Sequence, residues 1–219
     1  LGRALAARHV ERPVAAVVTR TRVAEDDPGF QHPTKPIGRY LPEDEARAMI
    51  EHGQNWEDRG ERGWRRVVAS PEPQEILDAP AVSALIAAGF VVIAAGGGGV
   101  PVVRDPDGTI RGVEAVIDKD LAAAVLGRTV SADVLVIATD VDHVVLGFGT
   151  DEAKAIESAD VRTMRDYASE GHFAAGSMGP KVEAACRFVE QGGRRAVITS
   201  LDRIAAAVHG EAGTEIIPG

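Results

Sequence analysis

The chain has little cysteine, little lysine and few aromatic residues, and it has no long apolar run. The single Cys186 excludes an intramolecular disulfide and a cysteine-based metal cluster, and it indicates a reducing compartment, which we take to be the cytoplasm. No apolar stretch approaches the roughly 20 residues of a membrane span. The formal net charge of −9 argues against a nucleic-acid partner, because binding to a phosphate backbone needs a basic face. We therefore expect a globular protein whose partner is a small molecule.

Lysine is scarce, since only four of the 24 basic residues are lysine and the rest are arginine. Lysine offers a compact point charge, whereas arginine offers a rigid planar fork. Three of the lysines, Lys35, Lys119 and Lys181, lie beside loop-forming or helix-starting residues. This placement predicts ammonium groups directed at a small anion, most simply phosphate. The alternative is chance placement of a small number of residues.

Strands alternate with helices through most of the chain. Runs of β-branched and apolar residues predict strands, and apolar residues at helical spacing predict helices. The expected strands are 13–23, 90–95, 100–103, 133–138, 195–199 and 214–217. The expected helices are 42–52, 74–88, 118–126, 161–169, 177–190 and 202–208. The alternation predicts an α/β fold with a mostly parallel sheet, in one domain of residues 1–219.

Residues 36–70 differ in composition from the rest of the chain. Charged residues crowd positions 55–66, and both tryptophans, Trp56 and Trp64, fall there. We expect this stretch to form a distinct, exposed insertion in the domain.

A four-glycine loop, Gly96–Gly99, follows the expected strand 90–95. Glycine lets the backbone approach an anion closely and present N–H groups to it. No G-x-G-x-x-G helix start follows, which argues against a Rossmann dehydrogenase. The loop is either an anion site or a tight, purely structural crossover.

Two lysines lie in the first turns of expected helices. Asp118 is a candidate N-cap, and Lys119 then opposes the helix dipole at a cost of about 0.3–1 kcal/mol. Lys181 follows Pro180, which opens a helix well because its missing N–H is not needed there. Either neighbouring aspartates offset this conflict, or the lysines and the free helix N–H groups act together on a phosphate. In the second case one of the two flanking aspartates could orient lysines across the site without touching the substrate. The alternative is that Asp118, Lys119 and Asp120 are simply three solvated charges at a helix start.

Two aspartates follow the buried strand 133–138. Asp140 and Asp142 could hold ribose hydroxyls, or Mg²⁺ together with phosphate oxygens, or they could be turn residues that bond their own backbone. His143 and His172 lack a second ligand at metal-binding spacing, so neither is interpreted as a metal ligand. Cys186 lies on the apolar face of its helix and is expected in the core.

Several long strings of residues resemble carbamate kinase, of the amino acid kinase superfamily. The similarity runs from near Glu11 to the C-terminus, and the strings occur in one order. They are DPGFQHPTKPIG (27–38), VVIAAGGGGVPV (91–102), GVEAVIDKDLA (112–122), GHFAAGSMGPKVEAA (171–185) and ITSL (198–201).

The resemblance implies a three-layer αβα sandwich, a homodimer, and transfer of a phosphoryl group between ATP and carbamate, run mainly toward ATP in arginine catabolism. ATP or ADP with Mg²⁺ would be the cofactors. Residues 36–70 would form a protruding subdomain, from which Lys35 would reach the carbamate. Lys119 and Lys181 would hold the phosphoryl group and the nucleotide phosphates, with Asp120 organising them. The other implied contacts are Gly97, Gly98 and Gly99 to carbamate, and Thr139, Asp140, Val141 and Met178 to nucleotide.

The start of the chain departs from the family pattern. Family members begin with a strand that carries a Gly-Gly-Asn phosphate loop, and a Gly-Asn-Gly-Pro loop follows; neither occurs here. The first residues, 1–8, lack Met and a secretory pattern and are typical of a helix already under way. We expect an N-terminally incomplete fold with unpaired strand edges, and weak stability or inactivity of these residues alone. The alternatives to carbamate kinase are another phosphotransferase of the superfamily and a catalytically inactive nucleotide-binding fragment.

Overall fold

The structure is a computed structural model that describes residues 1–174 and 176–219. One of its sheets has four strands, in the order β10 (Val134–Thr139), β14 (Arg195–Ser200), β15 (Thr214–Ile217) and β13 (Ser158–Asp160). The pairs β10–β14 and β13–β15 are parallel, and β14–β15 is antiparallel. The chain between the two strands of each parallel pair contains helices, which is what the alternation of strands and helices predicts.

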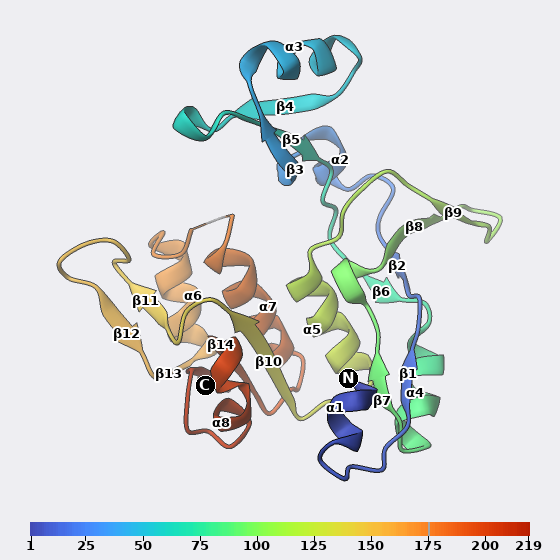
Figure 1. The fold of residues 1–219 in the computed structure, drawn as a ribbon, viewed down its shortest axis with the longest axis vertical. Coiled ribbons are helices and arrows are strands. Elements are labelled where there is room, and N and C mark those ends of the chain that lie inside the picture. The colour runs from blue at the N-terminus through green and yellow to red at the C-terminus, as the bar shows by residue number, and fades with distance from the viewer. Residues whose placement is uncertain (175) are drawn as a thin grey trace.

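Helices pack on this sheet to give layers (Figure 1). Helix α7 (Met178–Glu190) packs on β14, and α6 (Val161–Ser169) packs on β13 and on α7. Helix α8 (Ile204–Val208) packs on β10 and β14. This is the three-layer arrangement that the sequence analysis expects. No helix among residues 1–174 and 176–219 is long and apolar enough to cross a membrane.

A second group of strands lies on the N-terminal side. Strand β1 (Val14–Ala16) pairs in parallel with β7 (Val91–Ile93). A four-stranded sheet follows in the order β6 (Glu75–Ile76), β2 (Arg20–Arg22), β8 (Val100–Arg104) and β9 (Ile110–Gly112), in which β2 and β8 are parallel. The remaining helices here are α1 (Gly2–Ala6), α2 (Pro28–Gln31) and α4 (Ala79–Ala87).

Helix α5 (Lys119–Thr129) connects the two halves because it contributes to both apolar cores. Ala124 belongs to the larger core, with Phe188 and Met164. Ala122 and the preceding Ile117 belong to the smaller one. The start of α5 is therefore held from two sides, which makes it a rigid place from which to direct side chains.

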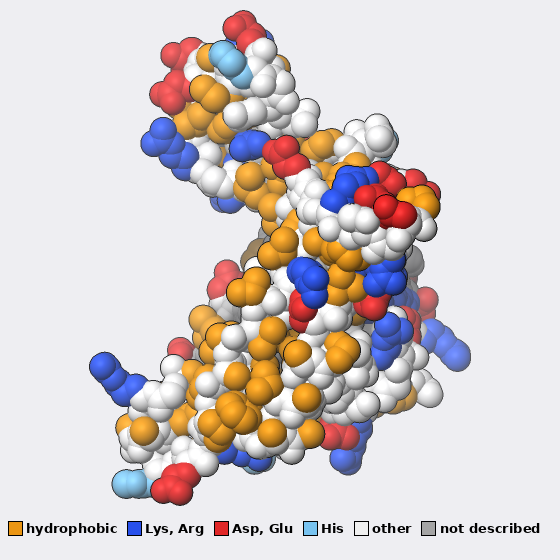
Figure 2. Space-filling model, turned by 90° about the vertical axis from the view of Figure 1, so that its right-hand side faces the viewer, with side chains coloured by type: hydrophobic (Ala, Val, Ile, Leu, Met, Phe, Trp, Pro, Cys, Tyr) orange, Lys and Arg blue, Asp and Glu red, His pale blue; other side chains and the backbone are white. Residues whose placement is uncertain are grey.

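Residues 35–68, which lie between β2 and β6 in the chain, form a unit that stands away from the layered body (Figure 1). Its antiparallel sheet has the order β3 (Lys35–Leu41), β5 (Trp64–Val68) and β4 (Asn55–Asp58), with α3 (Glu43–Glu51) packed on β4 and β5. Figure 2 shows this protruding subdomain overhanging a hollow. A hairpin of β11 (Val144–Leu146) and β12 (Lys154–Ile156) lies at the other end of the body.

Two differences between the expected and the observed elements lie in the N-terminal half. The strand expected at 13–23 is two strands, because the chain changes partner from β7 to β8 around Thr19. The Thr19 hydroxyl accepts a hydrogen bond from the Ala95 amide at 2.9 Å where the change occurs. The helix expected at 74–88 begins only at Ala79, since Glu75 and Ile76 pair with β2 instead.

Candidate active site

Helix α5 begins at Lys119, directly after the capping residue Asp118. The Asp118 carboxylate accepts hydrogen bonds from the backbone N–H groups of Asp120 and Leu121, at 2.9 and 3.2 Å. These amides are among the groups that a helix start leaves without partners. The cap satisfies both, so they are not available to a bound anion. The sequence analysis allowed for Lys119 to act on a phosphate together with free helix amides. For the amides of Asp120 and Leu121 this is wrong, because both already bond the cap.

Asp120 brings together two lysines from different helices. Its Oδ2 accepts hydrogen bonds from Lys119 Nζ at 3.1 Å and from Lys181 Nζ at 3.0 Å. The side chains of Asp120 and Lys181 are only 10% and 14% exposed, whereas that of Lys119 is 60% exposed. A buried carboxylate is costly unless it is paired, and here one carboxylate faces two ammonium groups. The trio therefore keeps one uncompensated positive charge.

Lys35 reaches the same helix start from the protruding subdomain. Its Nζ donates to Asp118 Oδ2 at 2.6 Å. Burial alone would raise the pKa of Asp118, but the hydrogen bonds from Lys35 and from the α5 amides outweigh it and hold the pKa below its usual value. The carboxylate is therefore ionised at neutral pH, and its ion pair with Lys35 ties the subdomain to the body.

The Gly96–Gly99 loop packs directly against the residue before the cap. A Cβ added at Gly98 would lie 2.5 Å from the carbonyl oxygen of Ile117, and one at Gly99 would lie 2.4 Å from Thr21 Oγ1. Packing therefore accounts for glycine at these two positions without any ligand. A Cβ at Gly96 or Gly97 would meet nothing within 4 Å. The backbone of the first two glycines is thus the part that faces open space.

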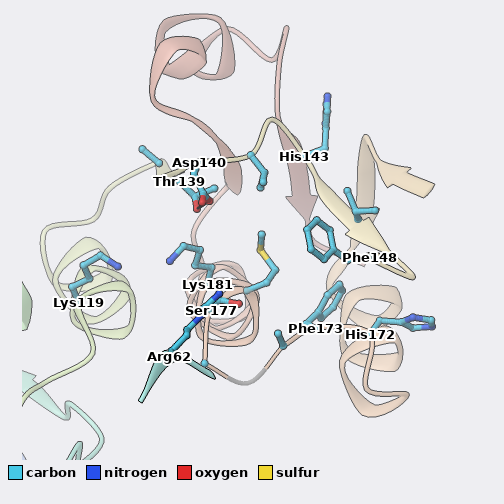
Figure 3. Close-up of a pocket in the computed structure, with 16 residues that line it drawn as sticks. Arg62, Lys119, Thr139, Asp140, His143, Phe148, His172, Phe173, Ser177 and Lys181 are labelled. Atoms are coloured by element: carbon cyan, nitrogen blue, oxygen red, sulfur yellow. Dashed lines mark hydrogen bonds between the residues drawn. The ribbon is translucent and has the colours of Figure 1, made fainter. Parts of the chain in front are cut away.

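A cavity of about 840 Å³ lies between α5, α7 and the segment after β10 (Figure 3). This volume is within the range of small-molecule sites. In Figure 3 the two lysines and Asp140 lie on one side, and Phe148 and Phe173 lie on the other. A charged end next to an aromatic end suits a ligand with an anionic part and an apolar ring. The lining also includes Arg62, Thr139, Val141, His143, Val145, His172, Ser177 and Met178.

The structure divides the expected site residues into two neighbouring groups. Lys119, Lys181, Thr139, Asp140, Val141 and Met178 line the cavity, and Asp120 holds its two lysines. Lys35 and Gly97–Gly99 are not part of the cavity lining. Lys35 reaches the start of α5 through Asp118, and the glycine loop reaches it where Gly98 packs against Ile117. The first turn of α5 is where both groups meet.

The two aspartates after β10 have different surroundings. Asp142 accepts hydrogen bonds from Ser200 Oγ at 2.5 Å and from Arg203 at 3.3 Å. The Ser200 bond, more than any other contact, lowers the pKa of Asp142. Asp140 lines the cavity. Among the described residues, its side chain accepts a hydrogen bond only from the hydroxyl of its neighbour Thr139, at 3.0 Å. No group of three His, Cys, Asp or Glu side chains in the described part of the chain could hold a metal ion.

Sequence reasoning did not assign several of the lining residues to the site, and the largest side chains among these belong to Arg62, Phe148 and Phe173. The scarcity of aromatic residues could have pointed to Phe148 and Phe173, because the chain has only five phenylalanines and these two line the cavity. Arg62 had no such signal, since it is one of several arginines in a charged stretch. Cys186, in contrast, lies fully buried in the larger core as expected, and burial raises the pKa of its thiol to about 11.

Comparisons with known proteins agree with the geometry. The amino acid kinase family matches residues 44–200. The chain is 50% identical over 214 residues to the carbamate kinase-like protein YahI of Escherichia coli (strain K12), covering 96% of this chain and 67% of that protein. It is 49% identical over 213 residues to a carbamate kinase of Thermococcus kodakarensis, again covering 96% and 67%. The chain thus spans about two thirds of the length of these relatives.

Solved structures give the same result. Carbamate kinase from Giardia lamblia bound to AMP-PNP superposes with a TM-score of 0.89 at 37% identity, over 99% of this chain and 69% of that one. A structure from Aeropyrum pernix K1 superposes with a TM-score of 0.93 at 40% identity, over 100% and 70%.

Proposed function

This chain belongs to the carbamate kinases of the amino acid kinase family, and from that premise we propose that its lysine cluster and cavity transfer a phosphoryl group between ATP and carbamate. The observation that carries the proposal is the contact of Asp120 with Lys119 and Lys181, two lysines that line a cavity of about 840 Å³. Phosphoryl transfer depends on positioning and on neutralising charge, and these are what the two lysines supply.

The reaction toward ATP needs no general base. The bond between phosphorus and the carbamoyl oxygen of carbamoyl phosphate breaks, and its electron pair leaves with carbamate. An oxygen of the β-phosphate of ADP, already anionic, forms the new bond to phosphorus. Negative charge on the transferring group is the main obstacle, so cations placed around it in advance supply the catalysis.

Each site residue then has one role. Lys181 and Lys119 contact the transferring phosphoryl group, and Asp120 fixes their positions. Lys35 contacts the carbamate from the subdomain side, next to the backbone of the Gly97–Gly99 loop. The nucleotide lies along the remaining cavity wall, formed by Thr139, Asp140, Val141 and Met178.

Mg²⁺ fits this set of residues. The ion usually takes one or two carboxylates and fills its shell with water and substrate phosphates. Asp140 offers one exposed carboxylate at the cavity edge, beside the Thr139 hydroxyl. We propose that Asp140 holds an ion that arrives with the nucleotide. When bound, the ion would neutralise part of the phosphate charge.

The wider setting rests on the resemblance alone. We propose that the protein is a cytoplasmic homodimer that works mainly toward ATP in arginine catabolism. Analytical ultracentrifugation of the purified protein would test the dimer, and the ratio of forward to reverse rates would test the direction.

A coupled assay tests the main proposal. The protein expressed from its own gene is supplied with ADP and carbamoyl phosphate, and ATP formation is followed. Acetyl phosphate serves as a control donor, and acetylglutamate, aspartate and UMP are offered with ATP as control acceptors. We expect ATP from carbamoyl phosphate and no comparable turnover of the others. Preference for a control substrate would assign another phosphotransferase activity, and nucleotide binding without any transfer would indicate a binding protein.

A further inference from the structure

Arg62 places a guanidinium group in the cavity from outside the layered body. It ends the short 3-10 turn Gly60–Arg62 between β4 and β5, far from the two lysines in sequence. It nevertheless lines the same cavity as Lys119 and Lys181. Figure 3 shows its side chain extending into the space beside Ser177 and Lys181. The protruding subdomain therefore contributes directly to the nucleotide cavity.

The neighbouring arginines are engaged elsewhere. Arg59 pairs with Glu57 at 2.5 Å, and Arg66 pairs with Glu114 at 3.4 Å. The Arg65 guanidinium lies 5.1 Å above the Tyr40 ring. Within residues 1–174 and 176–219, Arg62 makes no ion pair with a carboxylate, and it lies near the Tyr40 hydroxyl, whose pKa it lowers. Of these arginines it is the one whose charge remains available to an anion.

The charge balance of the site leaves room for such a cation. Apart from Asp140 at the cavity edge, three lysines face two aspartates, because Lys35 pairs with Asp118 while Lys119 and Lys181 share Asp120. A polyphosphate with a group in transfer carries more negative charge than this excess can offset. A guanidinium also presents paired donors that match two phosphate oxygens, which an ammonium group does not.

We propose that Arg62 contacts the phosphoryl group that the enzyme transfers, so that the protruding subdomain supplies one of the cations of the reaction. This inference rests on the function proposed above. It makes phosphate binding depend on how the subdomain sits over the body, and it adds a substrate contact that sequence reasoning did not find.

The test compares three variants of the protein expressed from its own gene. Arg62→Ala removes the cation, Arg62→Lys keeps the charge without the fork, and Arg59→Ala is the control from the same loop. Transfer between carbamoyl phosphate and ADP is measured beside calorimetric binding of AMP-PNP, ADP and adenosine. We expect Arg62→Ala to lower kcat/KM by about 10²-fold, Arg62→Lys to recover part of it, and Arg59→Ala to match the parent.

The binding measurements should show whether Arg62→Ala loses a contact with phosphate or instead disturbs the structure of the site. Arg62→Ala is expected to weaken AMP-PNP most, ADP less and adenosine not at all. Arg62 is exposed, so its variants should melt at the parent temperature by circular dichroism. Unchanged kinetics, or equal weakening of all three ligands, would overturn the role of Arg62. If the parent binds AMP-PNP but does not use carbamoyl phosphate, the proposed substrate fails while the binding series still decides the role of Arg62. A parent that binds no nucleotide would overturn both.

Discussion

Helices α5 and α7 both carry a lysine within their first turn, yet the two helix starts are built differently. At α5 the Asp118 side chain caps the helix, and Lys119 stays 60% exposed. At α7 the Ser177 side chain makes no cap, and the amides of Ser177 and Gly179 donate to the Ala174 carbonyl at 3.1 and 2.9 Å. Lys181 is only 14% exposed. One lysine is thus in solvent beside a closed cap, and the other is enclosed.

The difference shows how an unfavourable charge is accommodated. A lysine near a helix N-terminus opposes the dipole, and at α7 no side chain of the first turn offsets this. The compensating carboxylate comes from Asp120, on the neighbouring helix. Lys181 is therefore held by tertiary structure, in a setting where Coulomb interactions are stronger than in water. We expect it to matter more for transfer than Lys119 does.

The largest effect is expected from Lys181→Ala. Loss of the enclosed ammonium group should lower kcat by about 10²–10³-fold, as removal of one stabilising donor does in other enzymes. Lys154→Ala is the matched control, because Lys154 is an exposed lysine on β12, outside the cavity. Steady-state assays of ATP formation measure both. If Lys181→Ala is as active as Lys154→Ala, the enclosed lysine at the start of α7 has no special role in transfer.

A smaller loss is expected from Asp120→Asn. Asparagine keeps an oxygen acceptor but removes the charge that holds both lysines, so their ammonium groups should separate. We expect kcat to fall by about 10–10²-fold, equivalent to about 1.4–2.7 kcal/mol of barrier, with a smaller change in KM for ADP. Asp140→Asn, at the cavity edge, should instead change the Mg²⁺ dependence. If Asp120→Asn leaves kcat unchanged, the lysines do not need their shared partner.

Lys119→Ala should have a weaker effect that depends on salt. Because Lys119 is well solvated, its field is screened more strongly than that of Lys181. We expect about a tenfold loss of kcat/KM at low ionic strength, shrinking as salt is added. The corresponding ratio for Lys181→Ala should stay nearly constant over the same salt series. Equal salt dependence of the two variants would contradict the assigned difference in enclosure.

The smallest effect is expected on stability, from Asp118→Asn. Asparagine still caps α5, so this change isolates the ion pair with Lys35, worth about 1 kcal/mol or less for a partly exposed pair. The pKa of Asp118 is lowered in the folded protein. Its charge therefore stabilises the fold above the unfolded pKa, and this contribution is lost as pH falls through the folded value.

Urea unfolding of the parent and of Asp118→Asn across pH 3–7 measures this contribution. The difference in unfolding free energy between the parent and Asp118→Asn should be greatest at neutral pH and should disappear at the acidic end of this range. A gap that stays constant with pH would show that the ionised form of Asp118 has no part in it.

The sequence was sufficient for features that depend on local pattern. The apolar spacing of residues 182–189 predicted α7, and the Asp118 cap predicted where α5 begins. The conflict of both lysines with their own helix dipoles indicated that something nearby offsets them, but only the resemblance to the family named Asp120 as the residue that organises them. The two helix predictions needed only the chemistry of neighbouring residues.

Features that depend on chain path could not be predicted. The contact of Lys35 with Asp118 joins residues 83 apart in the chain, and no local pattern links them. The partner change near Thr19 depends on where β7 and β8 lie. Arg62 is chemically identical to its neighbours Arg59 and Arg66, so only the turn geometry selects it.

The glycine loop also decides where new activities could be engineered. At positions 98 and 99 even a methyl group meets backbone or a buried threonine, so these positions are closed to redesign. Position 96 has open space and no left-handed backbone requirement. A library aimed at larger acyl acceptors should therefore vary residue 96 first, and treat the rest of the loop as fixed scaffold.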